Sequence, residues 1–108
     1  MRICGFFFVI FLFSFSLTTD LKADSKKMVL GLDVFNNKAM CSACHVLKAA
    51  GSTGNIGPDL DSLKPSEEQV RDVVVEGLGV MPAFGEEGLL TSEEIDAVSY
   101  YVAYSSGK

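Results

Sequence analysis

The sequence predicts an all-α domain in which three main helices are joined by long loops. Two of the helix starts carry capping boxes, and apolar residues recur after them at helical spacing. No run of alternating apolar and polar residues is long enough to make a sheet. The loops are rich in glycine and proline, and loops of this length are uncommon in a compact domain unless they wrap something. We therefore expect the helices and loops to surround a bound group.

Residues 1–23 are expected to be a secretory signal peptide, which leaves 24–108 as one mature domain. After a positively charged start, an almost unbroken apolar run extends from Ile3 to Leu17. The run is shorter than the roughly 20 residues of a transmembrane helix, but it suits the apolar core of a signal peptide. We place cleavage after Ala23, with an uncleaved membrane anchor as the alternative. Cleavage predicts a periplasmic protein without stable membrane insertion.

The mature chain is acidic. The signal peptide takes two of the 9 basic residues and one of the 14 acidic residues, which leaves 7 and 13 and a net charge of −6. Nucleic acid and anionic membranes repel such a protein. Its expected partners are proteins with basic docking surfaces, because opposite charges steer their encounter.

The first helix is expected to run from about Ser25 to Asn36. Met28, Leu32 and Phe35 fall on one face of it, at i, i+4 and i+7. Ser25 carries the hydroxyl of a typical N-cap.

The second helix follows Pro65 and is expected to end at Gly77. Ser66 and Gln69 form its capping box. Its buried face is expected to consist of three valines, Val70, Val73 and Val74.

The third helix follows Thr91, which forms a capping box with Glu94, and is expected to run to about Ser105. Its apolar side is formed by Ile95, Val98, Tyr101 and Val102.

The chemistry of the chain centres on Cys41-Ser42-Ala43-Cys44-His45. C-x-x-C-H is the pattern of a covalent haem attachment site. Each thiol adds to one haem vinyl group, and two intervening residues let a single backbone turn bring both sulfurs within reach. His45, the only histidine of the chain, is then carried under the iron as the proximal ligand. We therefore expect one haem c per chain, attached through Cys41 and Cys44.

Three other interpretations of these residues compete with haem. A thioredoxin-like dithiol would need a βαβ context, which the sequence does not predict. A zinc site needs about four ligands, and no second group of cysteines or histidines is present. A disulfide suits an oxidising compartment, but it would close only a short loop and leave the adjacent histidine unexplained.

The ligand on the far side of the iron decides what a haem can do. Met28 lies on the apolar face of the first helix and is expected in the core, and Met40 adjoins Cys41 and cannot reach the distal face. Met81 lies in a loop and precedes Pro82, which keeps its predecessor out of a helix. Because His/Met ligation is typical of cytochromes c, we predict Met81 as the second axial ligand.

Together these residues resemble the class I c-type cytochromes, which are small monohaem electron carriers. The resemblance spans the whole mature chain. Its motifs are the C-x-x-C-H segment, Gly57-Pro58-Asp59-Leu60, Met81-Pro82-Ala83-Phe84-Gly85 and the closing helix with Tyr100, Tyr101 and Val102. The implied fold is the cytochrome c fold, with three main helices and long loops around one haem.

The resemblance also implies roles for single residues. The carbonyl of Pro58 would accept the Nδ1 proton of His45, which orients the ring and raises its basicity. Leu60 and Phe84 would pack on the haem. The family's first helix carries a glycine and an aromatic residue four apart that pack on the last helix, and Gly31 and Phe35 keep this spacing. The chain departs from the family at 36–40, where the link to Cys41 is about two residues longer.

The predicted function is a soluble periplasmic electron carrier that is not itself an enzyme. With His45 and Met81 both on the iron, no position would remain for a substrate. The alternatives are a dedicated cytochrome subunit of a periplasmic dehydrogenase or reductase complex, and a gas-binding or peroxidase-like protein that lacks Met81 on the iron.

Overall fold

The computed structural model describes the backbone of residues 18–108 and the side chains of residues 24–108. The expected apolar core of the signal peptide lies outside the described residues. The elements, in chain order, are helix α1 (Thr18–Asp33), π-helix η1 (Val34–Lys38), 3₁₀-helix η2 (Cys41–Ala43), strand β1 (Val46–Leu47), 3₁₀-helix η3 (Lys48–Ala50), strand β2 (Ser52–Thr53), and helices α2 (Leu60–Leu63), α3 (Glu67–Glu76) and α4 (Ser92–Ser105). The helix-rich fold confirms the predicted cytochrome c architecture. In the part of the chain described, no helix is long and apolar enough to cross a membrane.

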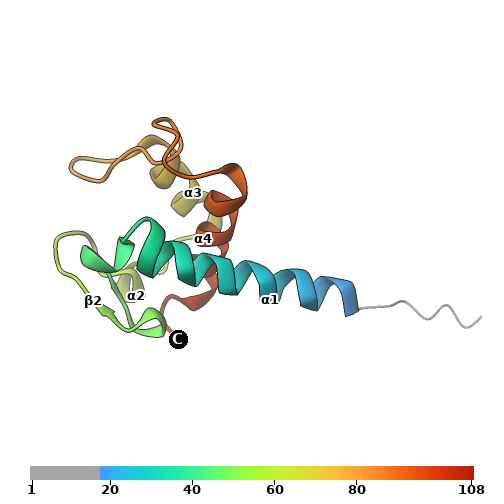
Figure 1. Ribbon diagram of the computed structural model, residues 1–108. Coiled ribbons are helices and arrows are strands. Elements are labelled where there is room, and N and C mark those ends of the chain that lie inside the picture. The colour runs from blue at the N-terminus through green and yellow to red at the C-terminus, as the bar shows by residue number, and fades with distance from the viewer. Residues whose placement is uncertain (1–17) are drawn as a thin grey trace, which may run out of the picture.

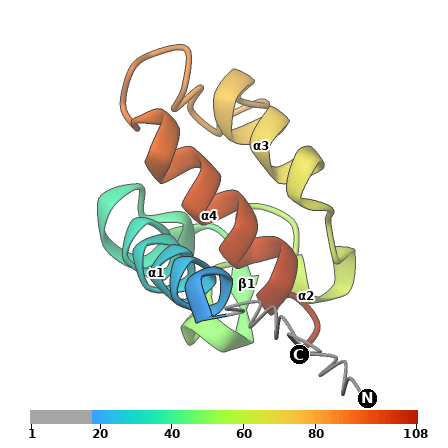
Figure 2. The same ribbon diagram turned by 90° about the vertical axis from the view of Figure 1, so that its right-hand side faces the viewer.

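The first and last helices pack directly against each other, α1 running across α4 (Figures 1 and 2). Gly31 lies at the crossing, where a Cβ atom would come within 2.4 Å of the Ala97 carbonyl oxygen and of Tyr101 Cβ. Phe35 is buried beside Tyr101, with ring centroids 6.1 Å apart. The spacing of Gly31 and Phe35 therefore serves the helix crossing that the resemblance implies.

The longer link before Cys41 is absorbed by a change of helix type. α1 ends at Asp33, and η1 continues as a π-helix, in which the Ala39 N–H donates to the carbonyl of Val34 at 2.8 Å. A π-helical turn closes over five residues in place of four, so it takes up extra chain without breaking the helix. Lys38 forms an ion pair from this turn with the mostly buried Glu94 of α4.

The two capping boxes predicted from sequence are both present. Ser66 and Gln69 cap α3, and Thr91 and Glu94 cap α4, which runs to Ser105 as expected. In α3 only Val74 is buried. Val70 and Val73 are half-buried because they line the cavity described below, which corrects their expected burial.

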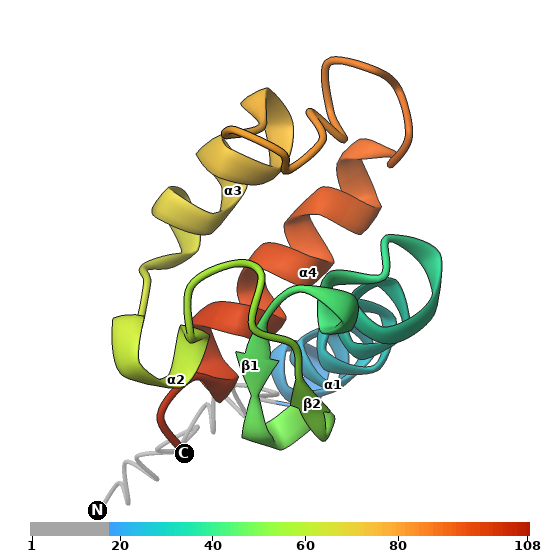
Figure 3. The ribbon, with the colours of Figure 1, turned by 90° about the vertical axis from the view of Figure 1, so that its left-hand side faces the viewer.

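The two-stranded sheet and helix α2 were not foreseen. β1 and β2 pair antiparallel, with Val46 opposite Thr53 and Leu47 opposite Ser52, which corrects the expectation of no sheet. Strands of two residues are too short to show alternation in a sequence. The second element is α2, which Asp59 caps by accepting hydrogen bonds from two backbone N–H groups. Figure 3 shows the strands and α2 on one side of the molecule, below α3 and α4.

Candidate functional site

The two cysteines lie on one tight turn, as the motif predicts. η2 begins after Met40, which has the left-handed φ of 54°, and the Cys44 N–H donates to the Cys41 carbonyl at 3.1 Å. The His45 N–H donates to the same carbonyl at 3.0 Å. Both thiols are free and half-buried. One short turn therefore presents two sulfur atoms and one imidazole together.

His45 is held in orientation by the loop that follows β2. Its Nδ1 lies 2.8 Å from the carbonyl oxygen of Pro58. Because a carbonyl only accepts, the proton must sit on Nδ1, which leaves the Nε2 lone pair available to a metal. This is the contact that the resemblance implies for Pro58.

Gly57 and Gly54 allow the backbone of this loop to approach the cysteine turn closely, a role that sequence reasoning missed. A Cβ atom on Gly57 would be 2.5 Å from Cε1 of His45, and one on Gly54 would be 2.6 Å from the Ala43 carbonyl oxygen. The Gly57 N–H also donates to the carbonyl of Cys44 at 2.8 Å. The glycine-rich composition of 51–57 was the signal in the sequence.

A cavity of about 1010 Å³ opens beside this turn, and its walls are predominantly apolar. Every predicted site residue lines it: Cys41, Cys44, His45, Pro58, Leu60, Met81 and Phe84. Val98 and Val102 of α4 and the three valines of α3 complete its apolar wall. The cavity also has lining residues that were not predicted, among them Met40, Ile56 and Leu63, which are exposed at its mouth.

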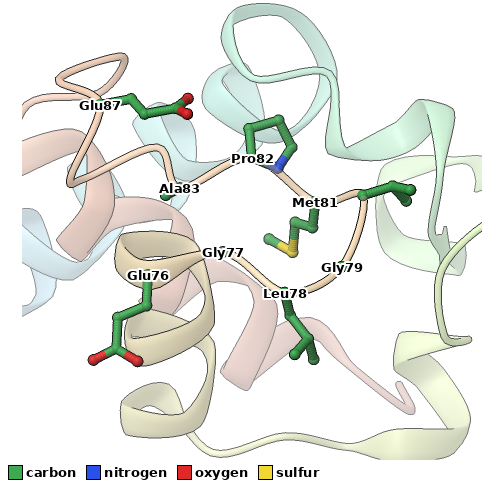
Figure 4. A pocket seen from close by; sticks show the side chains of 9 residues that line it. Glu76, Gly77, Leu78, Gly79, Met81, Pro82, Ala83 and Glu87 are labelled. Carbon is green, nitrogen blue, oxygen red and sulfur yellow. The ribbon is translucent and has the colours of Figure 1, made fainter.

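Met81 enters the cavity from a loop that is tied down at both ends. Leu78 and Met81 exchange two backbone hydrogen bonds across a tight turn, with Gly79 at a φ of 59°. The Gly85 N–H donates to the carbonyl of Val74 in α3. Figure 4 shows the Met81 side chain inside the space that the loop 77–83 encloses, a second and smaller cavity of about 610 Å³. Met81 thus lines both cavities.

The other two methionines among residues 24–108 differ from Met81 in position. Met28 is partly buried against the core, as expected. Met40 lines the large cavity but is 56% exposed and adjoins Cys41, on the same turn as His45. Among the described residues, Met81 is the methionine that approaches the cavity from a segment remote from His45.

The thiols do not have the surroundings of a redox-active pair. Burial raises the pKa of Cys41 to about 11. A catalytic dithiol needs a lowered pKa so that a thiolate forms. Nor do the described residues contain any group of three or more Cys, His, Asp or Glu side chains able to hold a metal ion. The dithiol and zinc interpretations gain no support from this environment.

A haem fits the site on its donor set and its shape. The cavity places two thiols and an oriented imidazole on one wall and a thioether on the Met81 loop, and its surroundings are largely apolar. These are the covalent and axial donors that c-type haem uses. Cys41 and Cys44 would hold the group, and His45 would face the iron.

Comparison with known proteins agrees with this fit. The family model described as cytochrome c oxidase, cbb3-type, subunit III matches residues 30–102. The chain is a c-type cytochrome. A solved structure, that of the c-type cytochrome SorU from Sinorhizobium meliloti, is similar to this cytochrome with a TM-score of 0.72 and 42% sequence identity. The likeness covers 78% of this chain and 95% of that one. A search of curated proteins found no match.

Proposed function

We propose that this cytochrome is a soluble periplasmic electron carrier whose single haem iron is held by His45 and Met81. The observation that carries the proposal is that these two side chains, 36 positions apart in the sequence, line one apolar cavity from separate loops. With both donors on the iron, no site for a substrate would remain. The protein would then exchange electrons without being an enzyme.

The haem, when bound, supplies a site that accepts and releases one electron. The chain's own residues prepare the surroundings for this. Pro58 fixes the tautomer and angle of the His45 ring through the 2.8 Å contact, and this hydrogen bond raises the basicity of the imidazole. The paired turn at Leu78 and Met81 restrains the thioether. Leu60, Phe84 and the valines of α3 and α4 keep water away from the cavity.

The periplasmic setting rests on the expected signal peptide and on the chemistry of haem attachment through two cysteines. The partners would be redox proteins that dock weakly and briefly, at the small end of interface sizes. The acidic net charge of the mature chain favours basic docking surfaces on these partners.

A second candidate function is that of a cytochrome subunit within a larger complex. The matching family, which is named for an oxidase subunit, favours it. The two candidates differ in the expected partner, since a subunit would remain bound through purification. Size-exclusion chromatography of protein taken from its native membrane and periplasmic fractions separates them, because a carrier elutes alone at its own mass.

Visible spectroscopy of the matured protein tests the axial ligands. Wild-type protein is expected to be low-spin in both oxidation states, to show the methionine–iron band when oxidised, and to resist carbon monoxide. Met81→Ala is expected to lose that band and to bind carbon monoxide. Met40→Leu is the matched control, because it removes a methionine from the same cavity and should leave the spectrum unchanged. A carbon monoxide adduct of native wild-type protein would overturn the His45–Met81 assignment.

A further inference from the structure

Charge is distributed unevenly along the mature chain. From Asp72 to Gly107 the sequence holds seven acidic residues and no lysine or arginine. Two of the seven are paired with cations from elsewhere, Glu94 with Lys38 and Asp96 with Arg71. The other five make no ion pair in the described structure: Asp72, Glu76, Glu86, Glu87 and Glu93.

The fold gathers four of these unpaired acids, Asp72, Glu76, Glu86 and Glu87, around the Met81 loop. Glu76 and Glu87 line the smaller cavity together with Met81, and Figure 4 shows the Glu76 carboxylate directed away from the loop. Asp72 lines the large cavity. The Glu86 N–H donates to the carbonyl of Val75, and this hydrogen bond holds Glu86 against the end of α3. We call the loop 77–88 with the adjoining Asp72 and Glu76 the Met81 end of the molecule.

Two of the unpaired lysines, Lys48 and Lys64, lie at the other end. Figures 1 and 3 show the C-terminus beside α2 and the strands, on the far side of the molecule from the Met81 loop. The Lys64 side chain packs against Gly107 there. The backbone of Lys48 donates to Asp61, which also accepts from the Gly107 N–H. This C-terminal end therefore combines lysines with aspartates, whereas the Met81 end carries acids alone.

The Met81 end also exposes apolar surface. Val80, at the tip of the tight turn, is 87% exposed, and Leu78 is exposed beside it. Both line the mouth of the large cavity. Apolar residues at the centre of a charged border are the usual composition of a protein docking patch.

We propose that the Met81 end is the face on which a redox partner docks, and that the partner is a protein with lysines or arginines around an apolar contact. The proposal rests on the electron-transfer function proposed above and adds an orientation to it. The concentrated negative charge would turn the Met81 end toward a basic surface before contact. A lipid or nucleic acid surface does not fit, because its phosphates would be repelled by the same acids.

Small redox reagents of opposite charge test this orientation without an identified partner. Reduced holoprotein is mixed in a stopped-flow instrument with tris(phenanthroline)cobalt(III), a cation, or with ferricyanide, an anion. The Debye length falls from about 30 Å at 0.01 M to about 10 Å at 0.1 M salt. Over this range the rate with the cation is expected to fall several-fold while the rate with ferricyanide rises.

Paired variants locate the effect. One double variant, Glu76→Gln/Glu87→Gln, removes two charges from the Met81 end, and a control, Asp24→Asn/Asp33→Asn, removes two from α1. The first is expected to lower the ratio of the cation rate to the anion rate at low salt at least two-fold more than the control. Equal changes in the two variants would show that only net charge matters and would overturn the proposal. The carrier function would still stand in that case, because both reagents would oxidise the haem.

Nuclear magnetic resonance provides a second readout of the docking face. Isotope-labelled holoprotein is titrated with a short oligolysine peptide as the basic probe. Amide shifts are expected in 72–93 and to be absent from the exposed face of α1. Shifts centred on α1 would contradict the proposal, whereas failure of reversible one-electron reduction in the same sample would instead remove the proposed function.

Discussion

Replacing Gly57 with alanine should displace His45, the proposed iron ligand, without changing any other proposed donor. A Cβ atom at this position would lie 2.5 Å from Cε1 and 2.9 Å from Nδ1 of His45. Ordinary contacts between carbon atoms lie at about 3.5–4.0 Å, so the ring or the loop must yield by about 1 Å. A shift of that size stretches the 2.8 Å contact between Nδ1 and the Pro58 carbonyl beyond hydrogen-bond range.

The expected result is a higher reduction potential. Without the carbonyl as acceptor, the imidazole is a weaker electron donor, which disfavours the oxidised iron. A typical net hydrogen-bond contribution of about 1 kcal/mol corresponds to roughly 40 mV for a one-electron couple. The potential is measured by spectroelectrochemical titration of wild-type and Gly57→Ala holoproteins.

Gly54→Ala is the control for this experiment. Its Cβ atom would approach the Ala43 carbonyl oxygen at 2.6 Å, so the strain is similar, but none of its close contacts is with His45. It should lower the melting temperature and leave the potential at the wild-type value. A folded Gly57→Ala protein with an unchanged potential, or equal shifts in both variants, would refute the positioning of His45 by this loop.

Three further predictions concern stability, each followed by thermal unfolding. The Lys38 ammonium, and then the Thr91 N–H, hold the pKa of Glu94 below its ordinary value. The ionised Glu94 carboxylate therefore stabilises the fold above the unfolded pKa of about 4.3. This stabilisation is lost as the pH falls through the lowered pKa of the folded state. Wild type should therefore melt a few degrees above Glu94→Gln at pH 7, and this advantage should shrink steadily as the pH falls below the unfolded pKa; an advantage that does not change with pH would contradict the ion-pair assignment. Gly31→Ala should cost about 1–3 kcal/mol, because its Cβ would approach the α4 backbone to 2.4 Å, and wild-type stability would mean that the helices do not cross there. Leu47→Ala removes a side chain with 0% exposure and should cost about 2–5 kcal/mol, whereas a loss below about 1 kcal/mol would place Leu47 outside the core.

The helices were predictable because their signals are local. The hydroxyls of Ser66 and Thr91 each lie three residues before the side chain that completes the capping box, so the starts of α3 and α4 can be read from four consecutive residues. The bounds of α1 were less predictable, because it begins at Thr18, so Ser25 lies inside the helix and is not its N-cap. Its change to a π-helix has no local sequence signal, and Phe35 in this turn contacts Tyr101 of α4, which is far away in the chain.

The strands and α2 escaped prediction for a different reason. β1 and β2 have two residues each, and they form because the loop returns onto the cysteine turn, with Ser52 Oγ accepting from the Leu47 N–H at 2.9 Å. α2 has four residues and depends on its Asp59 cap. Elements this short carry no period that a sequence pattern could reveal.

By itself the sequence predicted the haem attachment site of this cytochrome, because Cys41, Cys44 and His45 are close enough in the chain for their spacing alone to present them together on one backbone turn. Only the tertiary structure decided what surrounds that turn. It set Gly57 against the imidazole, brought Met81 into the same cavity as His45, and gathered four unpaired acids around the Met81 loop. These relations join segments separated by many residues, so they depend on how α1, α3 and α4 pack and not on any local pattern.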